Sequence, residues 1–276
     1  MLGINTNVPS LTAQKNLTSS SSSINTSIAR LSSGLRINSA RDDAAGLAIA
    51  TRMSSDIRGS EVAKRNTNDG ISALQIADGA LSSITDNVQR MRELAVQSAT
   101  GTLTTDDRAN LAAEFTELKT QIGTVVSSTK FNGVDLLTAA AATNDLVIQT
   151  GAGELAANNR TTVQLVDGTA IAGGLTAAAL TDAGSSQSAI GLLDTALTEL
   201  NKGRATIGAG INRLDAVVSN LDTTVTNVSA ARGRIMDADF AKETANLTRT
   251  QILQQAGTAM LAQANQLPNN VLSLLR

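Results

Sequence analysis

The chain has no histidine, cysteine, tryptophan or tyrosine, and phenylalanine occupies only three of its 276 positions. Without His and Cys, it lacks the usual general base at neutral pH, the thiolate nucleophile, disulfides and the ligands of most zinc and transition-metal sites. The composition therefore predicts no catalysis, no metal and no cofactor. A hydrolase that uses a Ser or Lys nucleophile is the remaining enzymatic alternative, and no motif supports it.

Charge is also sparse, at 17% of residues and a net charge of −2, and the basic residues are scattered singly. This pattern lacks the electrostatic footprint of nucleic-acid binding. The N-terminal stretch has no basic segment followed by an apolar run, so we expect no Sec-type signal peptide. No segment supplies about 20 consecutive strongly apolar residues, and we therefore expect no membrane insertion.

Proline occurs only at Pro9 and Pro268, which leaves the long interior free of the strongest helix breaker. Apolar residues in that interior recur at alternating spacings of three and four, the pattern of a coiled-coil seam. The first such seam contains Leu74, Ala77, Leu81, Ile84, Val88, Met91 and Ala95. A second contains Leu111, Phe115, Leu118, Ile122 and Val125, and a third runs from Leu193 to Ile235. Gly101 and the Thr/Asp cluster after it predict a turn and a helix cap between the first two seams.

Both chain ends are amphipathic as well, but neither has a sequence neighbour against which to pack. The apolar positions are Ile24, Ile28, Leu31 and Leu35 near the start, and Leu253, Ala256, Met260, Ala264, Leu267, Val271 and Leu274 near the finish. An isolated helix is marginal without packing. Apolar helix faces without a partner in the same chain predict self-assembly. Contacts between different patches of identical chains generate open helical filaments.

The segment 138–188 is rich in Ala, Gly, Thr and Asn, and its "DLVIQTGAG" and "TTVQLVDGT" predict short strands. Just before it, "FNGV" (131–134) predicts a tight turn, because Asn-Gly favours positive φ. The fold class predicted is mainly α, with long coiled-coil helices from both chain ends and a small β-hairpin region in the middle.

Two charged motifs could indicate chemistry. In "RINSARDDAAGLAIA" (36–50), adjacent helical carboxylates at Asp42 and Asp43 would point about 100° apart, which disfavours a general acid/base pair. We expect Ser39 and Asp42 to cap a helix instead. In "QRMRELAVQS" (89–98), Arg90 and Glu93 predict a solvated helix face, with a docking surface as the alternative.

Several stretches closely resemble bacterial flagellin: "LSSGLRINSARDDAAGLAIA" (31–50), "RNTNDGISALQIADGAL" (65–81), "QRMRELAVQSA" (89–99), "FNGV" and "QILQQAGTAMLAQANQLPNNVLSLLR" (251–276). The resemblance implies three regions. An inner coiled-coil domain would comprise 1–42 and 235–276, a helical second layer would comprise 43–137 and 189–234, and 138–188 would be a variable β-hairpin connector.

The resemblance further implies a secreted subunit that polymerises into the extracellular flagellar filament and supports swimming motility. Its partners would be further copies of itself, a type III export chaperone, and cap and hook-junction proteins, and its ends would fold on assembly. The end residues named above would form the subunit interface, joined by Arg36 and Arg41. A flagellar hook–filament junction protein is the alternative.

Two sites of innate immune recognition also follow from the resemblance. Arg90, Leu94 and Glu114 match positions through which flagellins engage a vertebrate Toll-like receptor, and residues 29–50 resemble the segment that a plant receptor kinase senses.

Overall fold

The computed structural model describes residues 6–138, 145–154 and 159–274, with side chains described as far as residue 266. The chain divides into two compact units. Unit 1 comprises Met1–Asp56 and Thr226–Arg276, and unit 2 comprises Ile57–Val225. Both ends of the chain therefore belong to the same unit.

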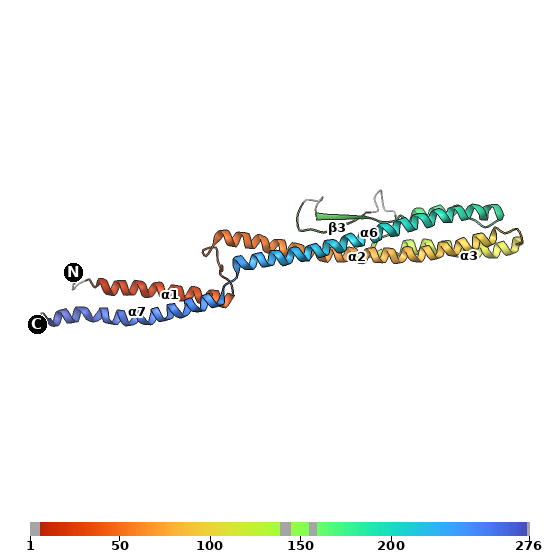
Figure 1. Ribbon diagram of the computed structural model, residues 1–276. Helices are drawn as coiled ribbons and strands as arrows, with labels where there is room; N and C mark the ends of the chain where they lie inside the picture. The colour runs from red at the N-terminus through yellow and green to blue at the C-terminus, as the bar shows by residue number, and fades with distance from the viewer. Residues whose placement is uncertain (1–5, 139–144, 155–158, 275–276) are drawn as a thin grey trace. The chain divides into compact units, whose positions relative to one another are not determined.

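In unit 1, helix α1 (Val8–Ser33) lies beside helix α7 (Phe240–Leu274) (Figure 1). Asn7 caps α1, because its side chain accepts a hydrogen bond from the backbone N–H of Ser10. The helix ends at Gly34, whose φ of 71° is left-handed and whose N–H donates to the carbonyl of Arg30. Both ends of α1 are thus set by local sequence.

A short antiparallel backbone pairing in unit 1 joins the segment after α1 to the segment before α7. Leu35 forms an isolated bridge with Asp237. The N–H of Arg36 donates to the carbonyl of Met236 at 2.6 Å, and the N–H of Ala238 donates to the carbonyl of Gly34 at 3.0 Å. Two non-helical stretches far apart in sequence are therefore held together by main-chain hydrogen bonds.

Unit 2 is built on α2 (Ala44–Ser98), α3 (Thr105–Ser128) and α6 (Ala183–Met236); α2 and α6 also contribute residues to unit 1. Ion pairs between α2 and α6 show that the two helices are antiparallel: Lys64 with Asp222, Asp78 with Arg204, and Arg92 with Asp194. After a turn, α3 starts at a capping box formed by Thr104 and Asp107. This confirms the turn and cap predicted after Gly101.

The predicted seam of α2 is the centre of the core of unit 2. Its seven residues are each no more than 1% exposed: Leu74, Ala77, Leu81, Ile84, Val88, Met91 and Ala95. Phe115 and Ile122 of α3 and Leu193 and Leu200 of α6 are buried in the same cluster. The 3,4 spacing predicted this core because it places one apolar row on one face of each helix.

The predicted β region is confirmed. Strands β1 (Lys130–Phe131) and β2 (Val134–Asp135) form a hairpin around Asn132 and Gly133, whose φ values are 49° and 80°. Positive φ at both central residues matches the twist of the paired strands. Strands β3 (Asp145–Gln149) and β4 (Arg160–Gln164) form a second antiparallel pair.

Aliphatic side chains of this β region sit against glycines of the long helices. Ile148 of β3 contacts α2 at Gly70, and Val163 of β4 contacts α6 at Gly210. A Cβ at position 210 would lie 2.7 Å from Val163 Cγ1, so the strands approach the helices as closely as backbone allows. Farther along the chain, α5 (Gly168–Gly174) and the 3₁₀ turn η1 (Leu175–Ala177) cover the core with Ile171 and Leu175.

Candidate functional site

The contact between α1 and α7 in unit 1 is antiparallel and is fixed by polar groups. Asn7 Nδ2 donates to the carbonyl of Ala264 at 2.8 Å, and Ser10 Oγ donates to Asn265 Oδ1 at 2.8 Å. Near the other end of α1, Arg30 Nη1 lies 3.9 Å from Glu243 Oε2. These contacts set the register without a large apolar seam.

On α1, the buried positions are serines. Ser10 and Ser27 are 6% and 5% exposed, whereas Ile28 is 49% exposed. The expected seam placed Ile28 toward the partner helix, but Ser27 takes the inward position beside half-buried Ile24 and Leu31. Ile28 therefore presents its side chain to solvent in the single chain, and Leu35 at the end of the set is half-buried.

On α7, the larger apolar residues of the expected row are exposed rather than packed against α1. Leu253 is 52% exposed, Met260 is 65% exposed and neighbouring Ile252 is 60% exposed. The residues that α1 buries are Glu243 and Ala264, at 8% and 7% exposed. The predicted assembly residues Leu267, Val271 and Leu274 lie outside the described side chains. The α1–α7 pair therefore places small and polar groups inside and larger apolar groups outside.

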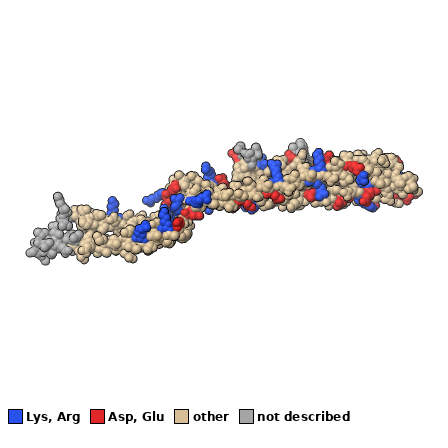
Figure 2. All heavy atoms as spheres, viewed as in Figure 1, with Lys and Arg blue, Asp and Glu red and all other residues tan. Residues whose placement is uncertain are grey.

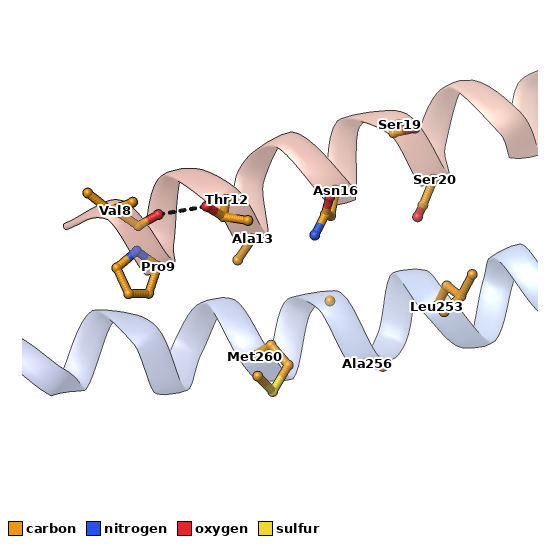
Figure 3. Close-up of a pocket in the computed structure, with 11 residues that line it drawn as sticks. Val8, Pro9, Thr12, Ala13, Asn16, Ser19, Ser20, Leu253, Ala256 and Met260 are labelled. Carbon is orange, nitrogen blue, oxygen red and sulfur yellow. Dashed lines mark hydrogen bonds between the residues drawn. The ribbon is translucent and has the colours of Figure 1, made fainter.

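A groove of about 730 Å³ runs along one side of this pair (Figure 3). Leu253, Ala256 and Met260 of α7 form an apolar wall, and Thr12 and Asn16 of α1 lie across from it. The groove is also lined by Val8, Pro9, Ala13, Ser19, Ser20 and Gly257. Its size and its mixed lining suit an amphipathic helix rather than a small polar ligand.

The surface around this groove is almost free of charge. No Asp, Glu, Lys or Arg occurs from residue 250 to residue 275, and α1 contains only Lys15 and Arg30. Figure 2 shows the described surface over α1 and α7 as mostly tan, with few blue or red side chains. Packing another helix against this face would therefore leave few charges to desolvate.

The "RINSARDD" segment is structural. Asp42 Oδ2 accepts hydrogen bonds from Ser39 N at 2.9 Å, Ser39 Oγ at 3.0 Å and Asn38 N at 3.1 Å. These bonds, the Ser39 hydroxyl first, lower the pKa of Asp42 below its usual value. The expectation that Ser39 and Asp42 start a helix was wrong: they close a turn, and α2 begins at Ala44.

Asp43 is the residue that caps α2, because its Oδ1 accepts the N–H of Gly46 at 2.8 Å. Arg36, expected at a subunit interface, donates through Nη2 to the carbonyl of Ile235 at 2.6 Å and so is engaged within the chain. Arg41 is exposed. The paired carboxylates that suggested chemistry thus stabilise two different backbone turns.

The Arg90 patch of unit 2 is an exposed ion-pair network. Arg90 Nη1 lies 2.9 Å from Glu93 Oε2 on α2, and Arg90 Nη2 lies 2.9 Å from Glu114 Oε1 on α3. Hydrogen bonds to Glu93 and Glu114 raise the pKa of Arg90. Leu94, matched to the same receptor contact, is 1% exposed and belongs to the core. Arg90 and Glu114 are therefore brought together at the surface, and Leu94 packs beneath them.

Within the described residues, no group of three or more His, Cys, Asp or Glu side chains could hold a metal ion. In the same part of the chain, no helix combines the length and hydropathy needed to cross a bilayer.

Comparison with known proteins identifies both ends of the chain. The bacterial flagellin N-terminal helical region matches residues 4–142, and the bacterial flagellin C-terminal helical region matches residues 190–275. Flagellin of Halalkalibacterium halodurans is 45% identical over 273 residues, and Flagellin FlaB2 of Treponema pallidum is 40% identical over 287, each match covering 99% of both chains.

Two solved structures are also similar. The crystal structure of Bacillus cereus flagellin matches with a TM-score of 0.51 and 36% identity, over 61% of this chain and 94% of that one. A flagellar hook-associated protein from Vibrio parahaemolyticus matches with a TM-score of 0.60 over 71% of this chain and 100% of that one. At 14% identity, the second likeness shows the fold alone.

Proposed function

Because this chain belongs to the bacterial flagellin family, whose members are structural subunits of the extracellular flagellar filament, we propose that it polymerises through the outward apolar face of α1 and α7. The filament so formed would drive swimming. The groove between the two helices would receive a helix from a neighbouring copy.

One observation supports this proposal most directly: the large apolar side chains of α7 at Leu253 and Met260 are exposed rather than buried within the α1–α7 pair. Leu253 and Met260 stand more than half exposed on a face that carries no charge, whereas Ser10 and Ser27 occupy the inside. Fully burying a Leu or Met side chain contributes about 1.5–3 kcal/mol. A neighbouring copy that covers this face would therefore supply the burial that the single chain lacks.

The same imbalance supports coupled folding and assembly of the ends. With serine, alanine and a loosely spaced Arg30–Glu243 pair at its contact, the α1–α7 pair gains little from closing on its own. Its helices would gain most of their stability when neighbours bury them. Marginal ends also suit a chain exported unfolded with a chaperone and then added beneath a cap, and we propose that route for this protein.

The hook–filament junction alternative shares this architecture, as the Vibrio parahaemolyticus structure illustrates. Two features favour a filament subunit. Both helical ends match flagellin regions, and relatives named as flagellins match along 99% of the chain.

Seeded elongation tests the proposed interface. Purified chain is added to short filament fragments, and growth is followed by electron microscopy. Leu253→Ser is expected to abolish elongation, because it places a hydroxyl in a contact that should be dry. Val147→Ser is the matched control, since Val147 is a similarly exposed apolar residue, at 53%, on β3 of unit 2. Elongation by Leu253→Ser at the rate of the control would overturn the proposal.

We also propose that the Arg90 patch is a contact for a vertebrate Toll-like receptor and that residues 29–50 are sensed by a plant receptor kinase. Exposure of Arg90 and Glu114 supports the first proposal, because a preformed charged pair can exchange partners at a receptor surface. Leu94 would then have an indirect role, because as a core residue it holds α2 in place and so positions Arg90.

A further inference from the structure

Methionine is the one readily oxidised residue type in this sequence. Cysteine, tryptophan, tyrosine and histidine are absent, and five methionines are present. The thioether of Met is converted by peroxides to a sulfoxide, which changes a flexible apolar side chain into a polar one. Mild oxidants should therefore act on this chain almost entirely at its thioethers.

These methionines differ widely in the exposed fraction of their side chains. Met91 is 0% exposed in the core of unit 2, and Met53 and Met236 are half-buried. Met260 is 65% exposed. Met1 lies outside the described residues. Because oxidation of Met follows access to the sulfur, Met260 should react first among the described thioethers.

Met260 also lies in the groove that is proposed to receive a neighbouring copy. It lines the groove with Ala256 and Leu253 of α7, and Pro9 and Ala13 of α1 point toward α7 in the same stretch (Figure 3). The surrounding face carries no charge, so an added S–O dipole would have no charged partner on α7 from residue 250 onward. Burying an unpaired polar group in a helix contact is costly.

We propose that Met260 is an oxidation switch for assembly: conversion of its thioether to a sulfoxide blocks addition of the subunit to a filament. The inference rests on the proposed function of the α1–α7 face. The oxidant is a peroxide. The sulfur lone pair attacks one oxygen of hydrogen peroxide, the S–O bond forms as the O–O bond breaks, and the sulfur is oxidised by two electrons. The second oxygen leaves as hydroxide and takes the proton of the transferred hydroxyl, so that the products are the sulfoxide and water. Methionine sulfoxide reductases reverse the product.

The test treats free subunits with hydrogen peroxide, removes the peroxide, locates the added oxygen by peptide mass spectrometry and measures elongation from untreated seeds. For each protein the readout is the ratio of elongation rates after and before treatment. The wild-type ratio should fall toward zero as Met260 is oxidised, and a methionine sulfoxide reductase should restore it. The ratio for Met260→Leu should stay near one, and that for Met236→Leu should fall as in the wild type.

Three results would overturn the switch: oxidised wild-type chain that elongates normally, loss of elongation in treated Met260→Leu, or oxidation that appears at Met91 before Met260. Met260→Gln gives an independent check, because a polar side chain of similar length should slow elongation without oxidant. Failure of untreated wild-type chain to elongate would refute the proposed function instead. The mass spectra would still decide whether Met260 reacts first.

Discussion

Asp43 and Gly46 depend on each other at the start of α2. The carboxylate of Asp43 accepts the N–H of Gly46 through Oδ1 at 2.8 Å, and a Cβ on residue 46 would lie 2.5 Å from Oδ2 of the same group. That Cβ would also lie 2.9 Å from Ile37 Cδ1, and Ile37 is 1% exposed. A side chain at residue 46 would therefore have to displace the capping carboxylate or the tip of Ile37.

Gly46→Ala should lower the free energy of unfolding by about 0.5–2 kcal/mol, because the methyl group displaces the Asp43 carboxylate and so weakens the cap of α2. Gly79→Ala is the matched control within α2, since a Cβ there meets nothing within 4 Å. An unobstructed helical Gly→Ala change stabilises by up to about 1 kcal/mol. Urea unfolding compares the two, and equal stabilisation by both would refute the role of Gly46.

Gly210→Ala should loosen the β3–β4 pair from α6. Its Cβ would lie 2.7 and 3.1 Å from the two methyl groups of Val163, which are fixed by branching at Cβ. We expect faster proteolytic cleavage within residues 145–164 and about 1–3 kcal/mol of destabilisation. Gly208→Ala, two residues away in open space, should show neither effect.

The capping box of α3 predicts a pH dependence. The Thr104 hydroxyl donates to Asp107 Oδ2 at 2.7 Å and the Thr104 N–H donates at 3.0 Å, and these bonds lower the pKa of Asp107 below its ordinary value of 3.8. A pKa lowered in the folded state contributes stability above the unfolded value, and that stability is lost as pH falls through the folded value.

Asp107→Asn should therefore have a lower Tm than the wild type at neutral pH, and the difference should shrink as pH falls from about 5 to about 3. Asp106→Asn leaves both Thr104 bonds in place and serves as the control. Thermal unfolding followed by circular dichroism gives the measurement. A Tm difference that is constant over this pH range would contradict the assignment.

Receptor recognition can be separated from folding at the Arg90 patch. Arg90→Ala should reduce Toll-like receptor signalling in reporter cells with little change in Tm, because an exposed ion pair contributes little to stability. Arg92→Ala, which breaks the exposed pair with Asp194 instead, should signal normally. Equal signalling by both variants would count against the patch.

Leu94→Ala should behave differently, since it removes a core side chain and should cost about 2–5 kcal/mol of stability. If only Leu94→Ala lost signalling, the loss would be explained by its lower stability and not by a missing receptor contact.

Sequence patterns predicted unit 2 far better than unit 1, and the reason is physical. In α2, apolar residues at 3,4 spacing have only one large core to enter, so the seven seam residues that start at Leu74 and end at Ala95 are all buried. In α1, the apolar spacing pointed to Ile28, but Ser27 is buried at 5% exposed and Ile28 is 49% exposed. The close approach of α1 and α7 admits serine and leaves the isoleucine outside.

The helix start at residues 39–46 shows a second limit. Asp42 and Asp43 are equally good caps by residue type, so the pattern could not distinguish them. The path of the backbone determines which aspartate caps α2. A turn after Asn38 directs Asp42 back to Ser39 and leaves Asp43 beside the first N–H groups of α2. The exposed apolar row of α7 was visible in the sequence, but its orientation depended on which face α1 covers.

The main-chain pairing of Leu35 with Asp237 has a mechanical consequence. A pull or twist applied to α1 or α7 must pass through the short non-helical stretches beside these residues, which as single strands would bend easily. Hydrogen bonds from Arg36 to Met236 and from Ala238 to Gly34 run crosswise between the two stretches, so a load on one stretch is shared with the other in shear. The Arg36 guanidinium, which donates to the carbonyl of Ile235, adds a side-chain bond to the same crossing.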